Sequence, residues 1–416
     1  MSKEKENGRF EKIIKLNNNF LKLLLLFVFL NLFSFASFGL GFNFDEETCT
    51  LNISASPVSS KRMIFDRDEV ETVIIEKGAD PWDVHDLHLN YWKKLKAIEV
   101  EKGNRRLYTD DEGVLYAICK WKKGKPCYIL ECYPRGKEDK KYKIIDGTTE
   151  VIPDTFDNPY LEDVTIPDSM RDVRDDSRCF GRRCCFVGCT NLKSITVGAN
   201  NKKYYVQDGG LIEIEVDDET GEIKHTLICY PRGRENKKCR VDVDKIDAYA
   251  LADNKHFETL ELSARVSDLN EEYSDRCGLV EGCENLKRIE VEEGNEWLST
   301  TNGLLLAKRK DGKPGNILVA YTIGDGEREK VEIPEGTAWI LNSAFSGAKK
   351  VNTIVVPRSM EAIFEYAFTN SGIKRLIYKG TKKQFDDTCD CKKYTLKGLK
   401  IIYLGDDDEE ACELED

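Results

Sequence analysis

The stretch GCTNLKSITV, residues 188–197, is nearly repeated 94 residues later as GCENLKRIEV, residues 282–291. Both copies contain an apolar–x–x–apolar–x–apolar order. The last two apolar residues of that order alternate with polar ones, as in a strand that buries one face. Because a single strand of this kind cannot bury its apolar side alone, the repetition predicts a chain of stacked units.

Further copies of the same order extend along most of the chain. They read VETVII (70–75), LKAIEV (95–100), LEDVTI (161–166), FETLEL (257–262), VNTIVV (351–356), IKRLIY (373–378) and LKGLKI (396–401). A shorter period links them, since Ile340 and Ile363 lie 23 residues apart and each is followed by a phenylalanine five residues later. A unit of this length with this strand is a leucine-rich repeat, whose strands stack in parallel on one face.

A longer module is superimposed on the short repeat. After LKAIEV, LKSITV and LKRIEV come an asparagine and then a glycine with an apolar strand: GVLY (113–116), GLIE (210–213) and GLLL (303–306). The hairpin partners of these strands are ILECYPRG (129–136), TLICYPRG (226–233) and ILVAYTIG (317–324). Tyr133 and Tyr230 are 97 residues apart, and Tyr230 and Tyr321 are 91 apart. The sequence therefore predicts three modules, each with two repeat units and an inserted β-excursion.

These motifs resemble the BspA-like leucine-rich repeats. The family's F-x-G-C-x-x-L order is similar to FVGCTNL (186–192), VEGCENL (280–286) and SAFSGAKKV (343–351), and its I-x-I-P-x-S strand exit is similar to VTIPDS (164–169) and VVPRS (355–359). The resemblance covers about residues 70–404. It implies an α/β repeat fold, a leucine-rich-repeat solenoid with a parallel β face and β-hairpin-like interruptions. It also implies attachment at the cell surface to proteins of a host or a neighbouring cell.

The N-terminal residues predict export. Six basic residues precede or enter a run of twenty uncharged residues, 23–42, and Ser34-Phe35-Ala36 offers the small residues that a signal peptidase reads. We expect a signal peptide over 1–36, a polar lead-in over 37–62, the solenoid over 63–404 and an acidic tail over 405–416. The alternative is an uncleaved anchor, since twenty apolar residues can span a bilayer. Either reading predicts a secreted or cell-surface protein.

Two insertions depart from the repeat. The usual five-residue step is 13 long between Val173 and Phe186 and 11 long between Leu269 and Val280. We expect the segments 174–186 and 270–280 to emerge as loops on the same side of the solenoid, because they fall at the same point of the unit. They are either decoration or a binding surface.

The fifteen cysteines divide into groups. Cys189 and Cys283 occupy one repeat position and read as buried thiols. Loop cysteines of the insertions could form bridges in an exported chain, with connectivity that spacing cannot give. These loop cysteines are Cys179, Cys184, Cys185 and Cys277. A further staple of the C-terminal end could involve Cys389, Cys391 and Cys412.

The sequence does not predict an enzyme. It lacks GxSxG, HExxH and a phosphate-cradling GxxxxGK[ST]. No CxxC pair is present, and His85 and His88 alone make an incomplete site, so we expect no metal and no cofactor. The net charge of −12 argues against nucleic acid as a partner.

A solenoid of this kind offers outward-facing strand residues as a binding surface. The candidates are Glu99, Thr196, Glu261, Glu290, Val355 and Ile377. The first four form an acidic or polar stripe and the last two an apolar end. We therefore expect an extracellular protein ligand with basic character, bound in adhesion. The alternative is a structural surface protein that assembles with itself, and the sequence leaves the oligomeric state open.

Overall fold

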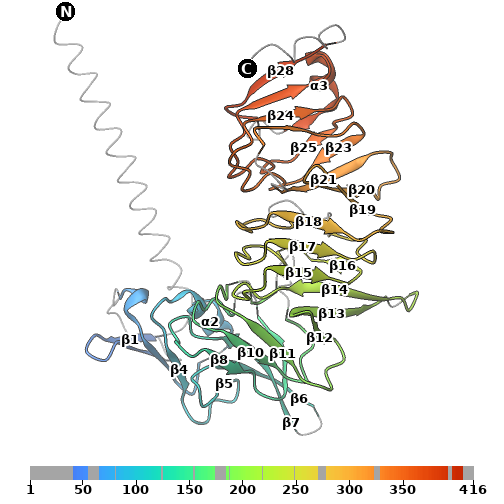
Figure 1. The fold of residues 1–416 in the computed structure, drawn as a ribbon. Coiled ribbons are helices and arrows are strands. Elements are labelled where there is room, and N and C mark those ends of the chain that lie inside the picture. Colours follow the sequence, from blue (N-terminus) through green and yellow to red (C-terminus); the bar gives the residue numbers. More distant parts are fainter. Residues whose placement is uncertain are drawn as a thin grey trace, which may run out of the picture.

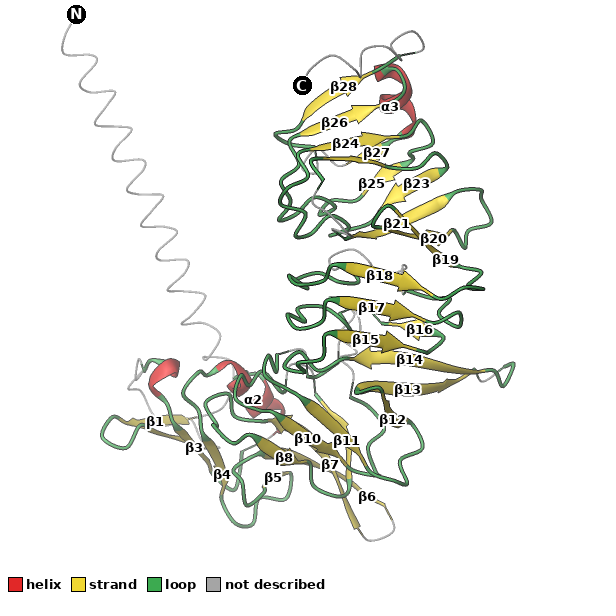
Figure 2. Cartoon of the chain, viewed as in Figure 1, coloured by secondary structure: helices red, strands yellow, loops and turns green. Residues whose placement is uncertain are grey.

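A computed structural model shows the chain as an elongated, curved solenoid in which successive turns stack from the N-terminal to the C-terminal end (Figure 1). The residues it describes are 41–54, 65–79, 81–122, 125–152, 155–173, 184–186, 188–217, 219–247, 249–269, 278–322, 328–391 and 396–405. Strands dominate these residues and helices are few (Figure 2). The predicted leucine-rich-repeat solenoid is confirmed.

Four sheets made of short, mostly parallel strands follow one another along the solenoid, and we call their outer surface the strand face. The first sheet contains β1 (Gly41–Asp45), β2 (Thr50–Ser54), β3 (Thr72–Ile75) and β4 (Ala97–Val100). The second contains β8 (Lys141–Lys143), β10 (Asp163–Ile166) and β11 (Ser194–Val197). The third contains β15 (Lys238–Val241), β17 (Thr259–Leu262) and β18 (Arg288–Val291). The fourth contains β22 (Lys330–Glu332), β24 (Thr353–Val356), β26 (Arg375–Tyr378) and β28 (Lys400–Tyr403).

Every copy of the apolar order found in the sequence contributes a strand to these sheets, and neighbouring strands pair in parallel. The second and fourth residues of each four-residue strand point inward. In β17 these are Leu260 and Leu262, both buried. The antiparallel pairing of β1 with β2 is the exception. Because β2 pairs in parallel with β3, the solenoid begins inside the segment 37–62 that the sequence suggested as a lead-in.

The three predicted β-excursions are present as antiparallel hairpins. The first sheet of this kind contains β5 (Leu107–Thr109), β6 (Leu115–Lys122), β7 (Lys125–Cys132) and β9 (Thr148–Val151). The next contains β12 (Tyr204–Gln207), β13 (Gly210–Val216), β14 (Ile223–Cys229) and β16 (Lys245–Ile246). The last contains β19 (Leu298–Thr301), β20 (Leu304–Lys308), β21 (Asn316–Tyr321), β23 (Thr337–Ile340), β25 (Ala362–Ile363) and β27 (Asp390–Cys391). Each hairpin rejoins the solenoid by parallel pairing with a repeat strand.

The helical elements are short. They are α2 (Pro81–His85), α3 (Lys382–Thr388) and the 3-10 turns Arg67–Glu69 and Leu89–Tyr91. A capping box fixes the start of α3, because the Thr381 side chain accepts from the Gln384 N–H while the Gln384 side chain accepts from the Thr381 N–H. Within the described residues, no helix is both long and apolar enough to cross a membrane.

An asparagine clamp ties neighbouring turns together. Asn158 Nδ2 donates to the carbonyl oxygens of Pro134 (2.9 Å) and Lys137 (2.8 Å), one turn back, and its Oδ1 accepts from the N–H groups of Tyr160 and Leu161. Because these backbone groups are buried or nearly so, the amide satisfies polar atoms that water does not reach. The same arrangement occurs at Asn104, Asn201, Asn254 and Asn295.

The glycine that ends each YPRG segment is a close backbone contact. A Cβ on Gly136 would lie 2.5 Å from the carbonyl carbon of Lys94, and one on Gly233 would lie 2.4 Å from that of Asn191. Both glycines donate a backbone hydrogen bond across the same contact, to Leu95 and Leu192. The end of the excursion therefore packs against the backbone of the preceding repeat so closely that no side chain larger than the hydrogen of glycine fits there.

The repeated cysteines are buried as expected. Cys189 Sγ donates to the Phe156 carbonyl oxygen and Cys283 Sγ to the Leu251 carbonyl oxygen, both at 3.1 Å. Of the insertion cysteines, Cys184 and Cys185 are buried and neither forms a disulfide. Both lie in one buried apolar cluster with Phe186. Cys179 and Cys277 lie outside the described residues.

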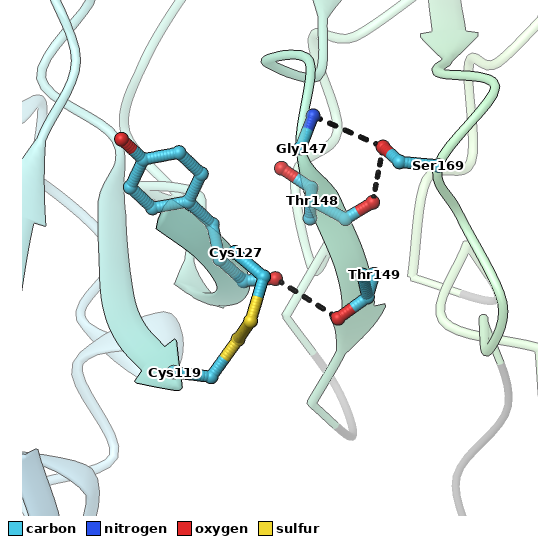
Figure 3. Close-up of a disulfide and its surroundings, with 7 residues drawn as sticks. Cys119, Cys127, Gly147, Thr148, Thr149 and Ser169 are labelled. Atoms are coloured by element: carbon cyan, nitrogen blue, oxygen red, sulfur yellow. Dashed lines mark hydrogen bonds between the residues drawn. A yellow bond between two sulfur atoms is a disulfide. The ribbon is translucent and has the colours of Figure 1, made fainter. Parts of the chain in front are cut away.

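One disulfide joins Cys119 of β6 to Cys127 of β7, which are direct partners in the hairpin register (Figure 3). Sequence analysis did not single out this pair, and a register shift between Leu115 and Tyr116 separates it from the start of the hairpin. Cys389 is also disulfide-bonded. The Cys391 side chain and Cys412 fall outside what is described, as do the predicted signal peptide at 1–36 and most of the predicted tail at 405–416.

Candidate binding face

The outward residues of the strand face form ladders, because parallel pairing places equal positions side by side. At the third position of the strands, Thr165 pairs with Lys143 and Thr196, and Glu261 pairs with Arg240 and Glu290. Five of the six candidate residues are at least partly accessible at this position. Glu99, Thr196 and Glu290 are exposed, and Glu261 and Ile377 are half-buried.

The expectation for Val355 needs correction. Its side chain has only 3% exposure. Val355 lies on the central strand β24, where Glu332 of β22 and Ile377 of β26 flank it in register. Alternation along a strand predicted an exposed side chain at this position, whereas every residue of β24 is buried. The apolar end of the face is therefore carried by Ile377 and its neighbour Ile402.

Basic residues lie among the acidic ones. Lys238 Nζ is 2.9 Å from Glu261 Oε1, and Arg240 is the register partner of Glu261. Arg288, on the same strand as Glu290, is exposed. In the third sheet the predicted stripe is therefore mixed in charge rather than acidic.

Charged side chains are more concentrated at the start of the strands than at the third strand position. We define the basic border as two residues for each strand of the second, third and fourth sheets: the residue before the strand and the first residue of the strand. Its neutral members are Ser194, Thr259, Asn352, Thr353 and Leu399. Its cations are Lys140, Lys141, Lys193, Lys237, Lys238, Lys287, Arg288, Lys330, Lys374, Arg375 and Lys400. Its acids are Glu162, Asp163, Glu258 and Glu329. All eleven cations are exposed.

Two of the border acids are held between lysines of both neighbouring strands. Lys140 and Lys193 each approach Glu162 to 2.8 Å. Hydrogen bonds from these lysines lower the pKa of Glu162 to about 2, the Lys140 contribution being the largest. Each such arrangement of two lysines and one glutamate has a net charge of +1.

Sequence reasoning missed the border, although a signal was present. Dibasic pairs precede or open four of its strands: Lys140-Lys141, Lys237-Lys238, Lys287-Arg288 and Lys374-Arg375. A repeated doublet at one repeat position predicts a row of charge in a stacked array.

The described residues contain no group of three or more His, Cys, Asp or Glu side chains placed to hold a metal ion. His85, one of the two weighed histidines, lies 3.4 Å from Glu131, and hydrogen bonding to that carboxylate raises its pKa. His88 follows α2 with a left-handed backbone and contacts Tyr91. The contact between His85 and Glu131 joins α2 to β7 of the first hairpin.

The sequence profile of the BspA type leucine rich repeat region matches six copies in this chain, over residues 149–278 and 324–402. The chain belongs to the BspA-type leucine-rich repeat family. The matched segments contain the strands of the second to fourth sheets of the strand face, except β8, β18 and the last residue of β28. No curated protein matches the chain.

Solved structures similar to this BspA-type chain include three bacterial proteins. A leucine rich cell surface protein from Faecalibacterium prausnitzii is 16% identical, covers 84% of this chain and 96% of its own, and gives a TM-score of 0.38. A leucine-rich repeat protein from Eubacterium ventriosum is 13% identical, with coverages of 81% and 94% and a TM-score of 0.42. The pneumococcal vaccine antigen PcpA is 13% identical, with coverages of 84% and 82% and a TM-score of 0.38.

Proposed function

We propose that this BspA-type protein is exported and that its strand face binds an extracellular protein, in adhesion to a host or a neighbouring cell. The observation that carries the proposal is the register of the strand face, which presents the same outward positions side by side on stacked parallel strands. A surface of this kind is broad and stiff, and it binds without a catalytic centre. We propose no enzymatic role.

Two further features support export. The N-terminal basic residues and the uncharged run 23–42 have the order of a signal peptide. The Cys119–Cys127 disulfide suits an oxidising compartment, because thiols in the cytoplasm are kept reduced. N-terminal sequencing and intact mass of the natively produced protein test this part. A start near Ser37 supports a cleaved signal peptide, whereas Met1 in the membrane fraction identifies an anchor.

The binding part is tested with the full chain immobilised and exposed to extracellular proteins of the host and of neighbouring cells. The test variant reverses two exposed strand-face charges, Glu99→Lys and Glu290→Lys. The matched control reverses two exposed charges away from that face, Glu112→Lys in the first excursion and Glu219→Lys in the second. We expect a retained protein that the control keeps and the test variant loses. No retained protein, or equal retention by both variants, contradicts the proposal.

A second candidate, self-assembly, has one observation in its favour. Val216 and Ile223 face each other across the end of the β13–β14 hairpin, which projects from the solenoid (Figure 1), and they are 57% and 56% exposed. An exposed apolar pair on a projecting hairpin is a candidate contact with another molecule. Sedimentation over a hundredfold concentration range tests it. Self-assembly predicts oligomers that a Val216→Asp substitution abolishes, and a monomer throughout rules it out.

A further inference from the structure

The charge of the basic border is opposite in sign to that of the chain. The whole sequence carries a formal charge of −12. The border carries eleven cations and four acids, and two of the acids, Glu162 and Glu258, already pair with lysines on both sides. A concentrated positive field on an acidic protein attracts an anionic partner to that place and away from the rest of the surface.

The cations are arranged as a row across the strands. In the fourth sheet Lys330, Arg375 and Lys400 occupy one register position on β22, β26 and β28, with Thr353 of β24 between the first two. Neighbouring strands lie about 4.8 Å apart, so the row has a cation roughly every 5–10 Å. This spacing is within about one Debye length at physiological salt, so the charges act together on a ligand that follows the row.

The side-chain composition of the border also disfavours some classes of ligand. None of the border residues is aromatic. Single-stranded nucleic acid is usually held by bases stacked on aromatic rings, and protein interfaces concentrate aromatic residues and are depleted in lysine. The exposed cations of the border offer positive charge and hydrogen-bond donors. These suit a linear polymer whose anionic groups recur along its length.

We propose that the basic border is a second binding surface, for a linear anionic polysaccharide lying across the strands. It goes beyond the proposed protein ligand and shares with that proposal only the export of the chain. The two surfaces use different strand positions, the border at the start of each strand and the protein-binding residues at the third position. Failure of one therefore leaves the other open to measurement.

The test uses the full chain and heparin as the probe, with neutral dextran and single-stranded DNA of similar length as the other arms. We expect heparin to bind, dextran not to bind and DNA to bind at least tenfold more weakly. Heparin affinity should fall roughly tenfold or more between 50 and 200 mM salt if three or more ion contacts form. Absence of heparin binding by the folded chain at 50 mM salt overturns the proposal.

Charge-neutralising variants locate the site. We expect the triple variant Lys330→Gln, Arg375→Gln and Lys400→Gln to lose at least tenfold in heparin affinity. A matched triple variant on exposed lysines away from the border, Lys202→Gln, Lys224→Gln and Lys313→Gln, should stay within twofold of the unmodified chain. The two triples change the net charge equally, so equal losses would show a non-specific charge effect and overturn the proposal.

Neutralising a border acid should raise the heparin affinity that the lysine and arginine substitutions lower. Lys237 and Lys287 lie 3.0 and 2.8 Å from Glu258. The substitution Glu258→Gln leaves both lysines with their charge and removes their ion-pair partner, so heparin should bind several-fold more tightly. Tighter binding to single-stranded DNA than to heparin, or displacement of heparin by polyglutamate at lower concentration than by heparin itself, would assign the border to another class of macromolecule and overturn the polysaccharide proposal.

Discussion

Glu162 and Glu258 occupy the same place in two successive modules, and each is paired with a lysine from the strand on either side. The four nitrogen–oxygen distances lie between 2.8 and 3.0 Å. The lysines come from the adjacent strand starts, so each glutamate links three consecutive strands of its sheet. The modules therefore repeat their electrostatics as well as their apolar core.

This relationship predicts a pH dependence of stability. Lysine hydrogen bonds lower the pKa of both carboxyl groups from 4.5 to about 2. Because the folded pKa is below the unfolded one, the contribution to the free energy of unfolding is complete above about pH 4.5 and is lost as the pH falls to about 2. The double variant Glu162→Gln, Glu258→Gln lacks this contribution.

The measurement is the thermal unfolding midpoint of the chain and of the double variant from pH 6 to pH 2. We expect the unmodified chain to be the more stable at pH 6 and the difference to shrink below pH 4.5. High salt should reduce the difference, since both pairs are partly exposed. Parallel curves over the whole range would mean that the lysines do not stabilise the carboxylates.

The asparagine clamp gives a second prediction. Asn158→Ala removes one amide that satisfies buried carbonyl and N–H groups of two turns. We expect a loss of about 1–3 kcal/mol in the free energy of unfolding, because buried polar groups lose their partners. Asn158→Asp keeps the acceptor but loses the donor, so it should also destabilise the chain.

Denaturant unfolding measures both changes. The control is Asn236→Ala, an exposed asparagine before the third sheet, which should shift the free energy of unfolding by less than about 0.5 kcal/mol. If Asn158→Ala behaves like the control, the clamp does not hold the turns together.

Sequence periodicity predicted the fold well because each copy of the repeat forms one turn of the solenoid. The local pattern of the sequence therefore also gives the order of the stacked turns. Every LxxLxL copy became a strand, and the Asn and Gly positions of each module became clamps and close contacts. The strands β8, β15 and β22 were missed because the apolar order there is reduced to one or two residues, as in KYK at 141–143.

The candidate site was less readable from sequence. Alternation gives the side of the strand but not what neighbouring strands place over it, which is why Val355 was expected at the surface and is buried. Charge posed a related problem. Glu261 read alone suggests an acidic surface, whereas Lys238 and Arg240 come from a strand that the pattern did not reveal.

The YPRG glycine gives a third prediction. Gly233→Ala places a methyl group 2.4 Å from the Asn191 carbonyl carbon, so the excursion or the preceding repeat must shift. We expect a loss of about 1–3 kcal/mol in the free energy of unfolding, the usual cost of overpacking. Gly136→Ala should behave alike, since its Cβ would meet Lys94 at 2.5 Å.

Chemical denaturation of the three variants provides the measurement, with Gly312→Ala as the control. Gly312 has a left-handed backbone, but a Cβ there meets no atom within 4 Å, so its substitution should cost less than either of the other two. Gly233 does not have the positive φ of Gly312, so equal losses at the two positions would mean that the close approach costs no more than left-handed backbone strain does.

The cysteines give the last prediction. Burial raises the pKa of both Cys189 and Cys283 to about 12, so neither thiol should react with iodoacetamide in the folded chain at pH 8. Unfolding without a reductant should make both react, while Cys119 and Cys127 stay blocked by their disulfide. Peptide mass mapping of the two labelling experiments measures this directly. Labelling of Cys189 or Cys283 in the folded chain would show that the module interior opens. Labelling of Cys119 and Cys127 after unfolding alone would show that the first hairpin is not covalently closed, and would remove the support that the disulfide gives to export.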